Sequence, residues 1–90
     1  MAELICEVSP GLRPSERSVA VRDIRGRRQF LRVEYDFLTR KGDKYYLPVG
    51  EVYYTAKDEV LIELPHEADS GANRLWVHRS DLLNSSETPA

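Results

Sequence analysis

The sequence predicts a small, mostly-β barrel formed by a single domain. Ninety residues is the length of one domain. Apolar residues recur with a period of two in several short stretches, and turn-forming residues separate these stretches at intervals of roughly 10–15 residues. Several short strands in so short a chain are typical of a barrel, and no stretch has the period of a long amphipathic helix.

The chain divides into three parts along its length. Residues 1–16 are expected to form an extended segment, with a short extended piece from Leu4 to Val8 and then a loop, because two prolines and a glycine break any helix there. Residues 17–83 are expected to form the barrel. Residues 84–90 are small and polar, and we expect a flexible tail.

Within the barrel, alternation places residues of each strand on a common face. Gly50 separates two β-rich segments, Tyr45–Val49 and Val52–Thr55, and predicts a kink or a bulge between them. A single helical turn is expected at Ser80–Leu83. The groups expected to share a face are Val19 with Val21; Leu31 with Val33, Tyr35 and Phe37; Val60 with Ile62 and Leu64; and Leu75 with Val77.

The segment Leu75–Leu83 (LWVHRSDLL) resembles the end of an SH3-like barrel, where a strand with an aromatic residue and a valine runs into a 3-10 turn and a closing apolar residue. The resemblance covers roughly residues 17–83 and implies about five antiparallel strands, with a 3-10 turn before the last. The chain departs from the peptide-binding SH3 domains. It has no Ala-Leu-Tyr-Asp-Tyr run, and His78 and Asp81 stand where the terminal motif has proline and tyrosine.

Two further resemblances carry less information about function. The run from Tyr46 to Val49 is similar to PRC-type barrels, and the stretch from Val60 to Val77 is similar to short bacterial proteins of unassigned function. Neither resemblance implies a mechanism.

Charge is unevenly distributed along the chain. The net charge is −2, but residues 12–32 hold seven arginines against two acids, and residues 34–69 hold nine acids against four basic residues. A single cysteine excludes an intramolecular disulfide. Since the N-terminus lacks the features of a secretory signal and no run of about 18 apolar residues occurs, we expect a cytoplasmic protein that does not enter membranes.

Aromatic residues supply the first candidate site. Each of the pairs Tyr45–Tyr46 and Tyr53–Tyr54 presents one ring to each face of its strand. Outward rings at Tyr46 and Tyr54, together with Trp76, would form a patch suited to a peptide, a base or a methylated amine. The alternative is ordinary packing of tyrosines on a half-buried sheet.

Arginines supply the second candidate. Five of them surround a glycine turn and could grip phosphates in a nucleic acid; they are Arg22, Arg25, Arg27, Arg28 and Arg32. The alternative is that they pair with the acidic middle of the chain.

The loop of residues 66–73 is the third candidate. His66 and Asp69 could contribute to a ligand site there, since loops often carry function. The spacing fits neither a calcium loop nor a zinc motif, and its polar residues are also those that turns require. No catalytic motif occurs, and we expect neither an enzyme nor a bound cofactor or metal.

These observations favour a non-catalytic binding module that recognises a protein or peptide segment through Tyr46, Tyr54 and Trp76, flanked by His66 and Asp69. The first alternative is a nucleic-acid-binding barrel that uses the arginines of residues 22–32. The second is a structural or oligomerisation domain, in which the Leu4–Val8 strand pairs with another copy or chain.

Overall fold

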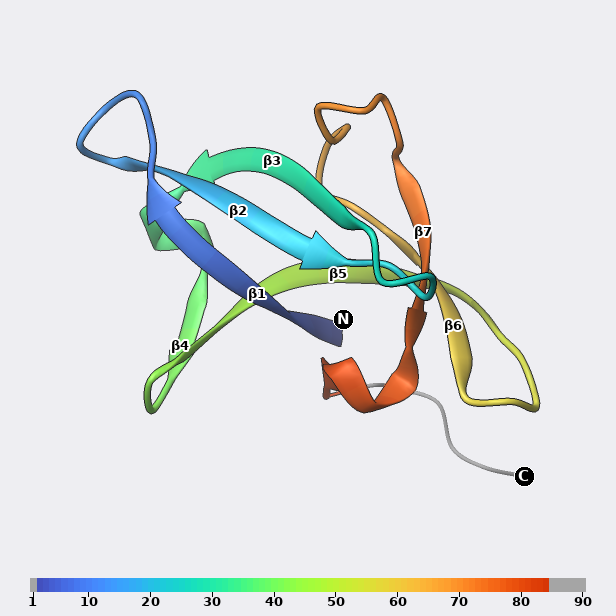
Figure 1. The fold of residues 1–90 in the computed structure, drawn as a ribbon. Helices are drawn as coiled ribbons and strands as arrows, with labels where there is room; N and C mark the ends of the chain where they lie inside the picture. Colours follow the sequence, from blue (N-terminus) through green and yellow to red (C-terminus); the bar gives the residue numbers. More distant parts are fainter. Residues whose placement is uncertain (1, 85–90) are drawn as a thin grey trace.

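The computed structural model describes residues 2–84 as one antiparallel sheet of eight strands that curls into a half-barrel (Figure 1). The sheet order is β3-β2-β1-β5-β6-β7, with β4 paired to β5 and β8 paired to β1. The strands are β1 (Ala2–Pro10), β2 (Glu16–Arg22), β3 (Arg28–Glu34), β4 (Thr39–Lys41), β5 (Lys44–Tyr54), β6 (Glu59–Glu63), β7 (Arg74–His78) and β8 (Leu82–Leu83). Two 3-10 helices complete the fold, η1 (Tyr35–Phe37) and η2 (Arg79–Asp81).

The mostly-β prediction and the 3-10 turn before the last strand are confirmed. The strand count is higher than the five expected. Strands β4 and β8, of three and two residues, are too short to produce a periodic pattern. The extended piece expected from Leu4 to Val8 is part of the longer strand β1, and residues 11–15 form the loop that follows it.

Strand β1 lies near the centre of the sheet. Its first half pairs with β5, its second half pairs with β2, and Glu3 and Leu4 also pair with β8. Every residue from Leu4 to Val8 therefore already pairs with a neighbouring strand. Self-association through this segment, as the sequence suggested, would have to use the edges of β1 that these strands leave open.

Strand β5 is shared between the two halves of the sheet. Its residues 45–49 pair with β1, and from Gly50 onward it pairs with β6. The register shifts between Glu51 and Tyr53, so Val52 is an extra residue in a bulge. The expected irregularity near Gly50 is thus a bend within a single strand, followed two residues later by a bulge.

The two ends of the curled sheet are joined by hydrogen bonds. The amide of Ile24, in the β2–β3 turn, donates to the carbonyl of Trp76 in β7 at 2.7 Å. The amide of Asp69 donates to the carbonyl of Phe30 in β3, also at 2.7 Å. Figure 1 shows the β2–β3 turn reaching the strand β7.

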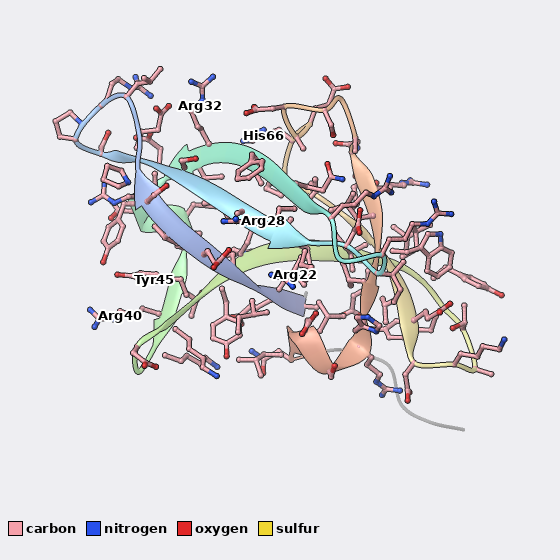
Figure 2. All side chains as sticks on the ribbon, viewed as in Figure 1. Arg22, Arg28, Arg32, Arg40, Tyr45 and His66 are labelled. Atoms are coloured by element: carbon pink, nitrogen blue, oxygen red, sulfur yellow. The ribbon has the colours of Figure 1, made fainter. Side chains whose placement is uncertain are left out.

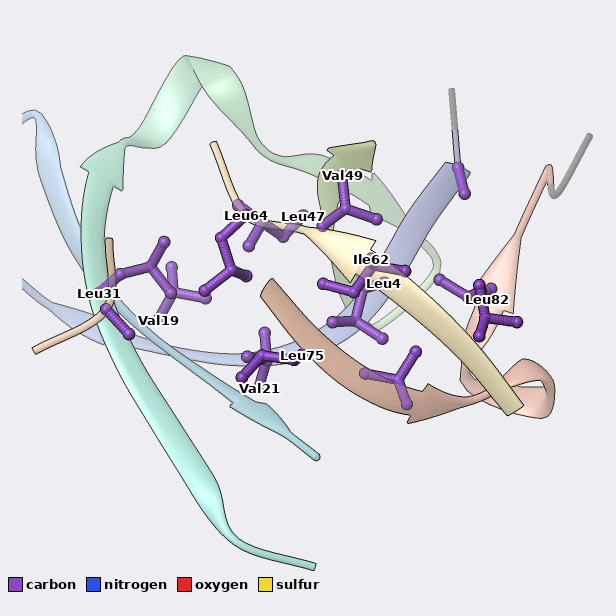
Figure 3. Close-up of a cluster of buried hydrophobic side chains, with 14 of the residues drawn as sticks. Leu4, Val19, Val21, Leu31, Leu47, Val49, Ile62, Leu64, Leu75 and Leu82 are labelled. Carbon is purple, nitrogen blue, oxygen red and sulfur yellow. The ribbon is translucent and has the colours of Figure 1, made fainter. Parts of the chain in front are cut away.

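The core fills the inside of the curl (Figure 3). The predicted face-sharing pairs on β2, β6 and β7 are buried together, as are Leu31 and Val33. Tyr35 and Phe37 do not share their face, because β3 ends at Glu34 and both rings project from η1 into solvent. The buried cluster consists of Ala2, Leu4, Val19, Val21, Leu31, Val33, Leu47, Val49, Val60, Ile62, Leu64, Ala68, Leu75, Val77 and Leu82.

The C-terminal region continues from η2 into β8 and Asn84. The expected turn at Ser80–Leu83 is the 3-10 helix η2, and it begins one residue earlier, at Arg79. The flexible tail expected over residues 84–90 lies, except for Asn84, outside the described residues. No helix in the described part of the chain is long and apolar enough to cross a membrane.

Candidate functional site

The predicted aromatic patch does not assemble from the expected rings. Tyr46 is the buried member of its pair, with 9% of its surface exposed. The Tyr54 ring is half-buried against the core, and its hydroxyl donates to Glu51 Oε2 at 2.6 Å. Tyr53, which is 60% exposed, is instead the neighbour of Trp76, with ring centroids 6.3 Å apart and planes at 89°.

The bulge at Val52 explains this difference. Tyr54 pairs with the inward-facing Val60, and Glu51 pairs with the inward-facing Ile62. The extra residue puts Glu51 and Tyr54 on the same face, three positions apart, which simple alternation forbids. A sequence pattern cannot locate such a bulge, because it depends on the pairing of β5 with β6.

The loop of residues 66–73 lies along the outer edge of β3. His66 Nε2 donates to the carbonyl of Arg32 at 2.7 Å, and the Ser70 hydroxyl donates to Gln29 Oε1 at 2.7 Å. Together with the backbone bond of Asp69, these contacts cover strand-edge groups that would otherwise be open to another chain. Within residues 2–84, no group of three or more His, Cys, Asp or Glu side chains is arranged to hold a metal ion.

The predicted arginines all lie on the β2–β3 hairpin. Arg22 stands directly opposite Arg28 in the register, whereas Arg25 and Arg27 are in the turn. Figure 2 shows Arg22 and Arg28 over the middle of the sheet and Arg32 extending beyond its edge. The hairpin therefore carries the five arginines without bringing their guanidinium groups to one point.

Two of these arginines are paired with acids. Arg27 Nε lies 3.0 Å from Asp23, and Arg28 Nη2 lies 3.0 Å from Glu7. Across the described chain, no ion pair is found for the other three, Arg22, Arg25 and Arg32. Neither acid belongs to the acidic middle of the chain, residues 34–69, so among the described residues the five arginines do not form the ion pairs expected there.

Asp23 organises the turn that carries these residues. Its side chain is only 4% exposed and accepts hydrogen bonds from the Arg25 and Arg27 amides, from Arg27 Nε and from Gln29 Nε2. Burial alone would raise the pKa of Asp23, but these hydrogen bonds outweigh it and hold that pKa below its ordinary value. The carboxylate is therefore a charged structural element of the turn.

A groove that the sequence did not reveal lies beside η1. Phe37 and Pro65 both line two adjoining hollows, of about 380 and 390 Å³. Val33 contributes to the first hollow, and Val49 and Leu64 contribute to the second, so core residues form part of the floor. Phe37 is 43% exposed, and its ring stands between the two hollows. We call this surface the Phe37 groove.

Charged residues surround one end of the Phe37 groove. Arg13 lies 3.4 Å from Glu34 and 3.7 Å from Glu16, so one cation faces two carboxylates. Arg32 lines the same hollow without an ion pair in the described residues. The two arginines and two glutamates at this end carry no net charge, and Arg32 is the cation among them without an ion pair in the described residues. Its exposed ring went unrecognised because Phe37 continues the alternation of β3 in the sequence.

Cys6 is the lone thiol of the chain and is partly buried. Burial raises the pKa of Cys6 to about 12, which disfavours the thiolate that a nucleophile requires.

Comparisons with known protein families, with curated proteins and with solved structures find no match to this chain.

Proposed function

We propose that this protein is a non-catalytic binding module that holds an extended segment of a partner protein in the Phe37 groove. The observation that supports this proposal is the position of Phe37, an exposed ring shared by two hollows with core residues in their floor. Exposed apolar side chains in concave surfaces are the usual anchors of peptide recognition.

The chemistry of the groove indicates which segment fits. An apolar side chain would enter the hollow beside Phe37 and Pro65, where it would be removed from water. An acidic side chain a few residues away would then meet Arg32, which forms no ion pair in the described structure. We therefore propose a partner segment that combines an apolar anchor with a nearby Asp or Glu.

We also propose that the half-barrel is a variant of the SH3-like fold. Three features support this relation: η2 separates β7 from β8, β8 pairs with β1, and the bent β5 serves both halves of the sheet. In this interpretation, the β2–β3 hairpin, η1 and β4 fill the long connection between the first strand and the bent one.

The proposal is tested with labelled peptides of about nine residues that carry one apolar and one acidic residue, against scrambled peptides without the apolar anchor. Binding is measured by anisotropy, and amide NMR spectra identify the residues that shift. Phe37→Ser should weaken binding tenfold or more, as expected when an anchor is removed. Tyr53→Ser is the matched control, because it removes an exposed ring outside the groove.

Arg32→Gln provides the second arm of this experiment. This variant should bind the acidic peptides more weakly and bind neutral versions of them as the parent does. Absence of shifts at residues 33–37, 48–50 and 64–66 with every peptide of the panel would contradict the proposal. Equal losses with Phe37→Ser and Tyr53→Ser would contradict it as well.

One observation favours nucleic-acid binding as a second candidate. Arg22 and Arg28 stand directly opposite each other, and like charges in that position destabilise a hairpin. Glu7 compensates Arg28 only, and a phosphate between the two guanidinium groups would compensate both. Arg22→Gln should weaken the binding of single strands if this hairpin is the interface, and should stabilise the free protein by removing the repulsion.

A further inference from the structure

A second surface, distinct from the Phe37 groove, combines cations with aromatic rings at the other side of η1. The guanidinium carbon of Arg17 lies 4.7 Å from the centre of the Tyr35 ring, and that of Arg40 lies 5.7 Å from the centre of the Tyr45 ring. The two rings meet edge to face, with centroids 6.3 Å apart and planes at 64°. We call Arg17, Tyr35, Tyr45 and Arg40 the Arg–Tyr ladder.

Four separate elements build the ladder. Arg17 comes from β2, Tyr35 from η1, Arg40 from β4 and Tyr45 from β5. Figure 2 shows Tyr45 and Arg40 side by side at the end of the sheet that carries β4. The elements η1 and β4 are short and consecutive. Tyr35 and Arg40 therefore lie at the same end of the sheet as Arg17 of β2 and Tyr45 of β5.

The charges of the ladder are uncompensated. Arg17 Nη1 donates to the carbonyls of Pro14 and Glu16, at 2.7 and 2.9 Å, and Arg40 Nε donates to the carbonyl of Gly42 at 2.9 Å. These bonds fix the orientation of both guanidinium groups but neutralise neither. Within residues 2–84, no carboxylate forms an ion pair with Arg17 or Arg40.

Two lysines add to this positive charge. Lys41 and Lys44 stand opposite each other in the β4–β5 hairpin, next to the register pair of Arg40 and Tyr45. Like charges in directly opposed positions cost stability, and neither lysine forms an ion pair in the described structure. The segment of residues 36–44 holds three basic residues against two acids, Asp36 and Asp43.

A hollow adjoins the ladder. Its volume is about 530 Å³, and Tyr45 and Arg17 form one wall while the loop from Pro10 to Pro14 forms the other. Leu12 in that loop is 81% exposed. Among residues 2–84, no side chain that lines this hollow carries a carboxylate. The hollow is thus bordered by apolar surface, an aromatic ring and positive charge.

We infer that the Arg–Tyr ladder and its hollow bind single-stranded nucleic acid. Bases stack on aromatic rings and on guanidinium planes, and unpaired cations beside them attract the phosphates. Tyr45 and Arg17 would hold a base in the hollow, while Arg40, Lys41 and Lys44 would contact the backbone. An acidic peptide would use the cations only and leave the aromatic component without a function.

The test measures the anisotropy of fluorescein-labelled twelve-nucleotide oligouridylate and oligothymidylate with the full chain, over a range of salt concentrations. Lys44→Gln and Arg40→Gln should each reduce the slope of log affinity against log salt by about 0.7, the value for one phosphate contact to a single strand. Lys57→Gln is the matched control, since Lys57 is an exposed lysine in the β5–β6 turn.

The aromatic component is tested separately. Tyr45→Leu should weaken binding roughly 5- to 150-fold, the range for loss of one stacked base. Tyr45→Phe keeps the ring and should bind almost as the parent does, which distinguishes lost stacking from damage to the fold. Circular dichroism and thermal unfolding of each variant provide the check on folding.

Four results would overturn the inference. The first is absence of binding to both oligonucleotides at low salt. The second is an equal effect of Lys44→Gln and Lys57→Gln. The third is retention of binding by Tyr45→Leu together with equal affinity for a polyglutamate peptide, which would identify a purely electrostatic surface. Loss of binding in Arg22→Gln alone would assign the nucleic acid to the β2–β3 hairpin instead.

Discussion

The amide of Ile24 and the carbonyl of Trp76 form a 2.7 Å hydrogen bond that joins the two ends of the curled sheet. The two residues are far apart in the chain, and they lie in the β2–β3 turn and in β7. With the bond from Asp69 to Phe30, this contact turns an open sheet into a half-barrel with a closed seam.

The seam predicts slow hydrogen exchange at two loop amides. Because Ile24 and Asp69 donate across the seam, their amides should exchange only when the seam opens, despite their positions in connecting segments. Exchange measured by NMR should therefore be protected at both, to a similar degree. Exchange at the rate of an exposed amide would show that the seam is open in solution.

Replacing Asp23 should destabilise the β2–β3 turn. Asp23→Asn removes the charge from a buried group that accepts four hydrogen bonds, and we expect a loss of about 1–3 kcal/mol in the free energy of unfolding. Urea denaturation measures this loss. Asp43→Asn, in the exposed β4–β5 turn, is the control and should change stability by much less.

The Asp23 carboxylate should make the free energy of unfolding depend on pH. The folded-state pKa of Asp23 lies below its ordinary value, so its contribution is complete above the unfolded-state pKa of about 3.9 and is lost as the pH falls through the folded-state pKa. The stability difference between the parent and Asp23→Asn should therefore be constant near neutral pH and shrink below pH ~4. A difference that grows on acidification would contradict this assignment.

Loss of the hydroxyl group should affect stability differently at Tyr53 and at Tyr54. Tyr54→Phe removes the 2.6 Å bond to Glu51 at a half-buried position and should cost about 1 kcal/mol. Tyr53→Phe changes an outward ring and should be nearly neutral. Thermal unfolding of the two variants gives the comparison, and a reversed order would place the bulge elsewhere in β5.

Local patterns in the sequence account for most of the fold. The alternation of Val60, Ile62 and Leu64 predicts burial correctly, because a period of two directly reports which face of a strand meets the core. The same pattern fails at Tyr35 and Phe37, because the alternation continues in the amino-acid sequence after the strand has ended at Glu34. Composition alone carries no signal for that break.

The candidate sites were less predictable because they depend on pairing between distant segments. Tyr53 faces outward beside Trp76 only because Val52 is an extra residue against β6. The Phe37 groove requires Pro65 to lie beside η1, and the Arg–Tyr ladder requires four elements to meet. The arginines of residues 22–32 were recognisable as a group because one hairpin carries them all.

The pairing of β1 with β8 sets the order in which the molecule can fold. Leu4 pairs with Leu82, 78 positions later, so β1 is synthesised long before its partner β8. Closure of the sheet must bring together the two ends of the described chain. Folding is therefore governed by long-range contacts, and the chain cannot complete its sheet during synthesis until Leu82 and Leu83 have left the ribosome.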